Sequence, residues 1–285
     1  MEQNDFYIGW MARAPGNVAL FIRQYLRLLI PLLLLLGLGL AGLQKKASTG
    51  NFEYGQPTRI TGVFHMHPTP YLRIFDGVDI GRAPLFQLIP LVGYGKSGAE
   101  GILHDLEQKT QTSFEGRLVT LSGTLIYNDG KTILQIGEDD STLRSIKMPT
   151  DFDSKNIQPV DLGSATVTGE IADPKCFFGV MKPGEGKPHR DCAIRCILGG
   201  IPPIMVVRNA KGEASYLLLV GPHGEHMNTA VQNFVAEPVT VRGRRVQIDD
   251  WIILYADDTT AIRRNNYLSE HYGKSIASCD ASCAK

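Results

Sequence analysis

The sequence predicts a mainly β protein, in which an N-terminal transmembrane helix precedes two tandem small β-barrels. Residues 28–43 form an uncharged, leucine-rich run, and residues 114–136 align without a gap with residues 234–256. Each aligned segment alternates apolar and polar side chains on both sides of an Asp-containing pair. Alternation with a period of two is typical of strands, and a short turn between two such runs is typical of a hairpin. Each segment therefore predicts a β-hairpin.

The leucine-rich run, LLIPLLLLLGLGLAGL, is close to the shortest length that spans a bilayer as a helix. The preceding residues make the helix long enough, with Arg23 and Arg27 reaching toward the membrane interface. We predict an uncleaved anchor at residues 26–43, with the N-terminus inside. The alternative is a signal peptide that is cleaved near Ala41. The prediction is a single-pass protein of a bacterial inner membrane, with the bulk of the chain in the periplasm or outside.

The duplication extends upstream of the two hairpins. The sequence TRITG at 58–62 matches ATVTG at 165–169, and Leu-Val-Gly occurs before the predicted helix in both copies. Each copy then reads strand, strand, strand, short helix, strand, strand, with the helices at 99–111 and at about 225–234. That order is what a five-stranded OB-like barrel needs. An internal duplication of one barrel is the simplest explanation.

These patterns divide the chain into six parts. They are a cytoplasmic tail at 1–25, the anchor at 26–43, a linker at 44–57, a first OB-like domain at 58–157, a second OB-like domain at 158–265 and a C-terminal tail at 266–285. The second domain carries a helical Cys/His insertion at 172–200, after its first strand. The corresponding loop of the first copy, predicted at residues 65–84, has no cysteine. The tail holds Cys279 and Cys283 and is interpreted as a disordered segment, a second thiol pair or a flexible arm.

The insertion concentrates the chemistry of the sequence. Pro188 suits the first position of a short helix, and the glycine pair at 199–200 suits its end. On that helix His189, Cys192 and Cys196 stand at i, i+3 and i+7, which places them on one face.

Cys176 precedes the same helix, across a loop at 181–187 that is rich in Pro and Gly. The sequence therefore predicts that the sulfurs of Cys176, Cys192 and Cys196 converge with the imidazole of His189.

Three interpretations of this cluster stay open. A set of three cysteines and one histidine makes a closed tetrahedral metal site, with zinc as the first candidate and iron or copper as alternatives. A disulfide would pair Cys176 with one helix cysteine, since neighbouring cysteines on a helix point in parallel directions. In the third interpretation the cysteines are small buried apolar residues.

The run from Asp173 to Pro203, DPKCFFGVMKPGEGKPHRDCAIRCILGGIPP, also carries a resemblance. It resembles a motif of uncharacterised bacterial proteins that are exported or membrane-anchored, with the pattern C-x-x-GVMKPG, then H-x-x-CA-x-x-C, then GGIPP. The resemblance implies a shared site and no particular reaction.

Other candidate sites are weaker. His65 and His67 would share a face if the first strand continued to residue 67, but two exposed side chains at a strand end are favoured. His223 and His226 precede the second predicted helix and are candidate ligands or turn caps. Residues 94–98, YGKSG, do not form a phosphate-binding loop, because the required upstream glycine is absent.

The composition favours a binding role. Lys plus Arg equals Asp plus Glu at 29 each, which argues against nucleic-acid binding. Recognised catalytic motifs are missing, so enzyme activity stays open and a non-enzymatic role is favoured. We predict a metal-binding accessory, structural or redox-supporting, of a protein complex in the cell envelope. The alternatives are a thiol–disulfide or electron-transfer protein, and an OB-type ligand-binding module.

Overall fold

The structure is a computed structural model, and it describes residues 16–43, 50–78, 84–139, 141–150 and 157–265. The chain forms two units, 1–47 and 48–285, which are considered separately. The predicted C-terminal tail with Cys279 and Cys283 lies outside the described residues.

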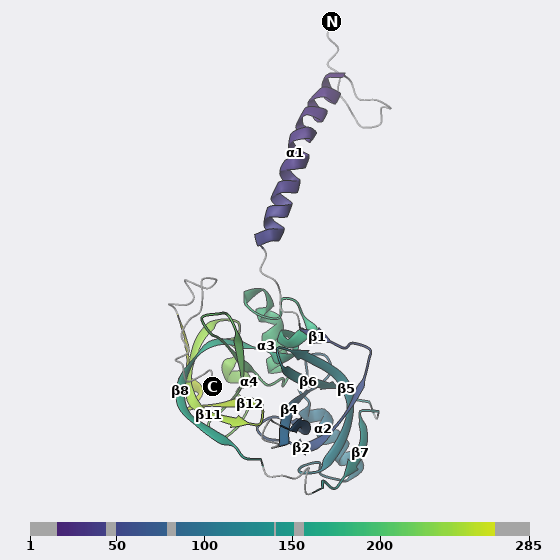
Figure 1. Cartoon of the computed structure of the whole chain (residues 1–285), viewed down its shortest axis with the longest axis vertical. Coiled ribbons are helices and arrows are strands. Elements are labelled where there is room, and N and C mark those ends of the chain that lie inside the picture. The colour runs from purple at the N-terminus through teal and green to yellow at the C-terminus, as the bar shows by residue number, and fades with distance from the viewer. Residues whose placement is uncertain (1–15, 44–49, 79–83, 140, 151–156, 266–285) are drawn as a thin grey trace. The chain divides into compact units, whose positions relative to one another are not determined.

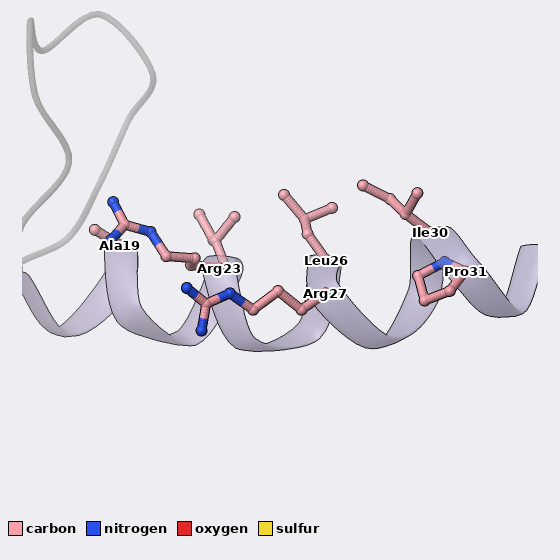
Figure 2. Close-up of a pocket in the computed structure, with 7 residues that line it drawn as sticks. Ala19, Arg23, Leu26, Arg27, Ile30 and Pro31 are labelled. Carbon is pink, nitrogen blue, oxygen red and sulfur yellow. The ribbon is translucent and has the colours of Figure 1, made fainter.

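The first unit contains one apolar helix, α1 (Gly16–Leu43). Its segment Val18–Leu43 is long and apolar enough to cross a membrane, and none of it is buried. The side chains of Arg23 and Arg27 point back toward the N-terminal end of the helix, away from Ile30 (Figure 2). That direction lets the charged groups reach an interface while the leucines stay in an apolar phase. The helix confirms the predicted apolar segment and fits either a membrane span or a signal sequence.

The second unit begins with a closed five-stranded barrel. Its strands are β2 (Thr58–His65), β3 (Tyr71–Val78), β4 (Pro84–Val92), β5 (Leu118–Asn128) and β6 (Lys131–Ile136). They follow the order β5-β2-β3-β4-β6 and close by pairing β6 with β5, with β4 and β6 parallel. Helix α2 (Glu100–Thr110) lies between the third and fourth strands, as predicted. Two further strands, β1 (Asn51–Phe52) and β7 (Leu143–Lys147), pair with β5.

A second closed barrel repeats this topology. Its strands are β8 (Val160–Ala172), β9 (Ile204–Arg208), β10 (Ala214–Val220), β11 (Pro238–Ile248) and β12 (Trp251–Ala256), with α4 (Asn228–Val231) before β11. The order is β11-β8-β9-β10-β12, closed by β12 and β11, and β10 and β12 are parallel. After a 3-10 turn, η3 (Thr259–Ala261), strand β13 (Ile262–Arg264) pairs with β11. The two barrels confirm the predicted mainly β, OB-like fold.

The strand registers of the two barrels are the same. Equivalent paired residues are Gly62–Val119 and Gly169–Val239, and Leu91–Leu134 and Leu219–Leu254. Both predicted hairpins turn where the sequence places them, after Asn128 and after Ile248. A shift of one residue would reverse the face of every side chain, so equal registers mean equal core positions.

Two predictions about the connections need correction. Helix α4 is shorter than the predicted segment of about 225–234, because the chain turns at Gly224 with a φ of +89° and the Glu225 carboxylate accepts the backbone N–H of His223. In the first barrel, β3 occupies much of the loop predicted at 65–84. Both faces of β3 are apolar at its start, which explains this: Leu72 is buried in the core of the first barrel, and Tyr71 is buried on the opposite face in a separate apolar cluster.

The barrels pack side by side within the second unit (Figure 1). Trp251, which is fully buried, donates its indole N–H to the carbonyl of Leu88 in the first barrel at 3.1 Å. Arg73 of the first barrel makes a two-point ion pair with Asp249 of the second, at 2.7 and 3.1 Å. These contacts bring the insertion of the second barrel against loops of the first.

Candidate metal centre

The insertion lies between β8 and β9, where the sequence places it. It consists of a π-helical turn η1 (Cys176–Val180), a 3-10 turn η2 (Lys187–His189) and helix α3 (Arg190–Leu198). Helix α3 ends before the predicted glycine pair, and Gly200 has a φ of +104°. Glycine adopts that conformation without strain, so it stops the helix and turns the chain toward β9.

The three cysteines of the insertion meet at one point. Cys192 and Cys196 are one turn apart on α3, and Cys176 enters from the start of η1. Their three sulfur atoms lie within 4.8 Å of one another, and all three are free thiols. Cys176 and Cys196 are buried, and Cys192 is half-buried. This cluster could hold a metal ion.

His189 belongs to a second, adjoining group. Its ring nitrogen, a carboxylate oxygen of Asp173 and the sulfur of Cys176 also lie within 4.8 Å of one another. All three residues are buried, and Asp173 is fully so. The Nε2 atom of His189 is 3.5 Å from Oδ2 of Asp173, while Oδ1 of Asp173 accepts the backbone N–H of Cys176 at 3.1 Å. The four residues predicted as ligands therefore occupy two groups that share Cys176.

Two lysines border the cysteines. Lys96, on the loop after β4, places its Nζ 2.9 Å from Sγ of Cys192 and 3.9 Å from Sγ of Cys196. Lys175 is buried and donates to the carbonyls of Gly93 and Gly95 at 2.7 Å each. The loop of the first barrel is thus fixed against the insertion of the second.

The electrostatics of the cluster follow from these contacts. The thiol of Cys176 donates to Cys196, which raises the pKa of Cys176 and lowers the pKa of Cys196. The hydrogen bond to Cys192 raises the pKa of Lys96. Burial lowers the pKa of Lys175 to about 8. One sulfur of the cluster is therefore favoured as a thiolate, which is the form that binds metals and attacks disulfides.

Sequence reasoning missed three residues of this site. Asp173 stands three residues before Cys176, and that spacing was the available signal, since an Asp often accepts a backbone N–H two or three residues ahead. Lys175 directly precedes Cys176, but its sequence context does not distinguish it from an ordinary charged residue. Lys96 had no local signal, because it comes from the other barrel.

The other histidines that the sequence offered as candidates, at positions 65, 67, 223 and 226, lie outside the two groups. Strand β2 ends at His65, whose Nδ1 is 2.9 Å from Glu115, and His67 beyond it is exposed. The favoured expectation for this pair, two exposed polar residues at a strand end, agrees with the position of His67, whereas His65 is half-buried. His226 pairs with Glu100 of α2 at 2.8 Å, and His223 is exposed in the turn before α4.

Comparisons with known proteins add no family to this geometry. No protein-family model matches the chain, and no curated protein matches it either. The functional argument therefore rests on the residues of the insertion and their surroundings.

Proposed function

We propose that the protein binds a transition-metal ion through the thiolates of Cys176, Cys192 and Cys196. The observation that carries this proposal is the convergence of three free sulfurs within 4.8 Å, two of them buried. Ligands of a tetrahedral ion bound at about 2.3 Å lie roughly 3.8 Å apart, so the cluster needs only a small contraction to close on an ion.

Zinc fits this donor set best. Thiolates are soft ligands that select zinc, cuprous copper and iron over magnesium or calcium. A three-thiolate core also suits a structural ion, whose binding energy contributes to folding. Iron and copper stay as alternatives with the same ligands.

The fourth ligand proposed from the sequence is His189. For His189 to complete the three-sulfur site, its ring has to swing from Asp173 toward the other two sulfurs. If it does, Asp173 becomes the residue that orients the imidazole, as carboxylates commonly do beside metal-bound histidines.

The cellular role follows from the helix and the site together. The length and apolar composition of helix α1 support a location at a bacterial inner membrane, with the protein either anchored in it or exported across it. Both barrels would then lie outside the cytoplasm. The motif resemblance to exported bacterial proteins supports the same location. We propose that the barrels act as a non-enzymatic accessory to a protein complex in the envelope, with the metal centre as its structural or redox-supporting part.

Metal analysis of the purified chain tests the proposal. The full-length protein, with Cys279 and Cys283 replaced by serine, is purified in detergent and measured for bound metal and reactive thiols. We expect bound zinc and thiols that react only after chelation. Cys192→Ser should lower metal occupancy and loosen the insertion, while the first barrel, which has no cysteine among its strands, stays folded. One reactive thiol without bound metal would reject the metal proposal.

The contact between Lys96 and Cys192 favours a second function, thiol–disulfide exchange. An ammonium 2.9 Å from a half-buried sulfur stabilises the thiolate that attacks a disulfide. Two thiols of the cluster would form one disulfide, and a partner's disulfide would accept their two electrons and two protons. In this case the chelator changes nothing, and the cysteines cycle between reduced and oxidised forms when the protein is mixed with a disulfide such as oxidised glutathione.

A further inference from the structure

The two donor groups of the insertion overlap at one atom, Sγ of Cys176. We propose that the insertion binds a second metal ion, held by Asp173, Cys176 and His189, with the sulfur of Cys176 bridging the two ions. This inference rests on the proposed function, because the three-cysteine site must exist for Cys176 to be shared.

The reach of a metal ion is the first argument. Two ligands of one ion are never farther apart than the sum of their bond lengths, which is about 4.3–4.6 Å for sulfur and nitrogen donors to zinc. Among the described residues, the donors that meet within 4.8 Å form two groups. One consists of the three sulfurs, and the other consists of Asp173, Cys176 and His189. His189 is not in the three-sulfur group. As arranged, these donors define two adjacent sites rather than one.

The distance between His189 and Asp173 is the second argument. Their separation of 3.5 Å is longer than a good N–H···O hydrogen bond, which spans about 2.7–3.2 Å. It is close to the distance between two ligand atoms of a tetrahedral zinc ion, because two ligands at about 2.0–2.1 Å from zinc lie about 3.3–3.4 Å apart. A cation between Nε2 of His189 and Oδ2 of Asp173 therefore fits their spacing better than a proton does.

The burial of Asp173 is the third argument. Its carboxylate is fully buried, and an ionised carboxylate in such a place needs cations or several donors. Oδ1 accepts the N–H of Cys176 at 3.1 Å, which fixes the side chain and leaves Oδ2 turned toward His189. Carboxylate, imidazole and thiolate are all ligands of zinc, so this trio is a complete three-residue donor set.

Metal stoichiometry tests the inference. The full-length chain with Cys279→Ser and Cys283→Ser is prepared reduced and metal-free in detergent, then titrated with Zn²⁺ and, separately, with Co²⁺. We expect two ions per chain. His189→Ala and Asp173→Asn should each bind one ion and keep the sulfur-to-cobalt absorption band, since the three-thiolate site survives. The matched control, His226→Ala, removes a surface histidine that pairs with Glu100 and should still bind two.

The outcomes separate this inference from the proposed function. One ion in the unsubstituted chain overturns the second site and leaves the first. No ion overturns both. Two ions in His189→Ala overturn the ligand assignment. If that variant fails to fold, X-ray absorption of the unsubstituted zinc form decides, because two zinc ions sharing one sulfur give a zinc–zinc scattering contribution and a single ion gives none.

Discussion

The ammonium nitrogen of Lys96 in the first barrel lies 2.9 Å from the sulfur of Cys192 in the second. The contact joins two residues that are 96 positions apart, and it exists because the loop after β4 packs on the end of α3. There the backbone N–H of Gly98 donates to the carbonyl of Gly199 at 2.8 Å. The cysteine cluster is therefore bordered by both barrels, although the cysteines themselves belong to one.

The first prediction concerns the effect of this lysine on thiol reactivity. In the reduced, metal-free protein, Lys96→Met should slow alkylation of Cys192 by iodoacetamide, because the sulfur loses the ammonium that contacts it at 2.9 Å. Lys96 is exposed, so solvent screens the interaction and we expect a change of about threefold to tenfold. Lys96→Arg should restore most of the rate. Peptide mapping by mass spectrometry follows Cys192 alone, and Lys211→Met, in an exposed turn, should leave its rate unchanged.

The second prediction concerns the close approach between the loop after β4 and α3. A Cβ added at Gly199 would lie 1.9 Å from the carbonyl oxygen of Lys96, so Gly199→Ala must displace the loop. We expect a loss of about 1–3 kcal/mol in the free energy of unfolding, together with faster alkylation of the cluster by a bulky maleimide. Gly101→Ala is the control, since nothing lies within 4 Å of its Cβ. Within α2 it should leave the free energy of unfolding unchanged or raise it by about 0.5–1 kcal/mol. Equal behaviour of the two variants would contradict the close packing.

The third prediction concerns the ion pair between the barrels. The side chains of Arg73 and Asp249 are 5% and 13% exposed, so Asp249→Asn removes a negative charge that directly contacts a buried guanidinium. We expect it to lower the free energy of unfolding by about 3 kcal/mol. Asn tolerates the positive φ of +49° at this turn, so backbone strain adds little. The surface pair of Arg242 and Asp257 is the control, and Asp257→Asn should cost less than about 1 kcal/mol. Similar losses in chemical denaturation would show that the buried pair does not hold the barrels together.

The fourth prediction concerns pH. Burial raises the pKa of Glu170 from 4.5 to about 7, and its carboxyl accepts the N–H of Gly186 at 2.7 Å. Because the folded-state pKa is the higher one, the stabilisation from the protonated form is fully present below about pH 4.5 and is lost as the pH rises through about 7. Glu170→Gln removes the ionisable group. As the pH rises from 5 to 8, the free energy of unfolding of this variant should therefore increase by about 2–3 kcal/mol relative to that of the unsubstituted protein. For the exposed control, Glu138→Gln, the free energy of unfolding should depend on pH as it does in the unsubstituted protein. The same pH dependence for Glu170→Gln would contradict the raised pKa of Glu170.

The fifth prediction concerns topology. A reporter fused after Arg264 should be active only in a compartment outside the cytoplasm, because α1 has the length and apolar composition of a membrane span. The fusion should stay with washed membranes if the helix is an anchor. Release of the barrels would instead show cleavage near Ala41, and activity in the cytoplasm would contradict export altogether.

The sequence by itself determined the repeated architecture. Residues 114–136 and 234–256, which align in the sequence, form hairpins with the same strand register. The registers agree because the alternation of apolar residues decides which face of each strand is buried. The glycine pair at 199–200 marked the end of α3, since glycine acts locally on the backbone, whereas Pro188 stands in the 3-10 turn η2 and α3 begins two residues later, at Arg190. The convergence of Cys176 with Cys192 and Cys196 also followed from helical spacing and one loop.

Only the tertiary structure decided what surrounds the cysteines. Lys96 reaches the cluster across the contact between two barrels, and periodicity along one chain carries no information about such a contact. His189 lies in the 3-10 turn η2 before α3 instead of on the predicted helix face, and its ring lies 3.5 Å from Asp173, because the direction of a buried side chain depends on packing from other segments. The length of α4 was likewise set by its turn, where Gly224 and Glu225 satisfy the backbone without another helical turn.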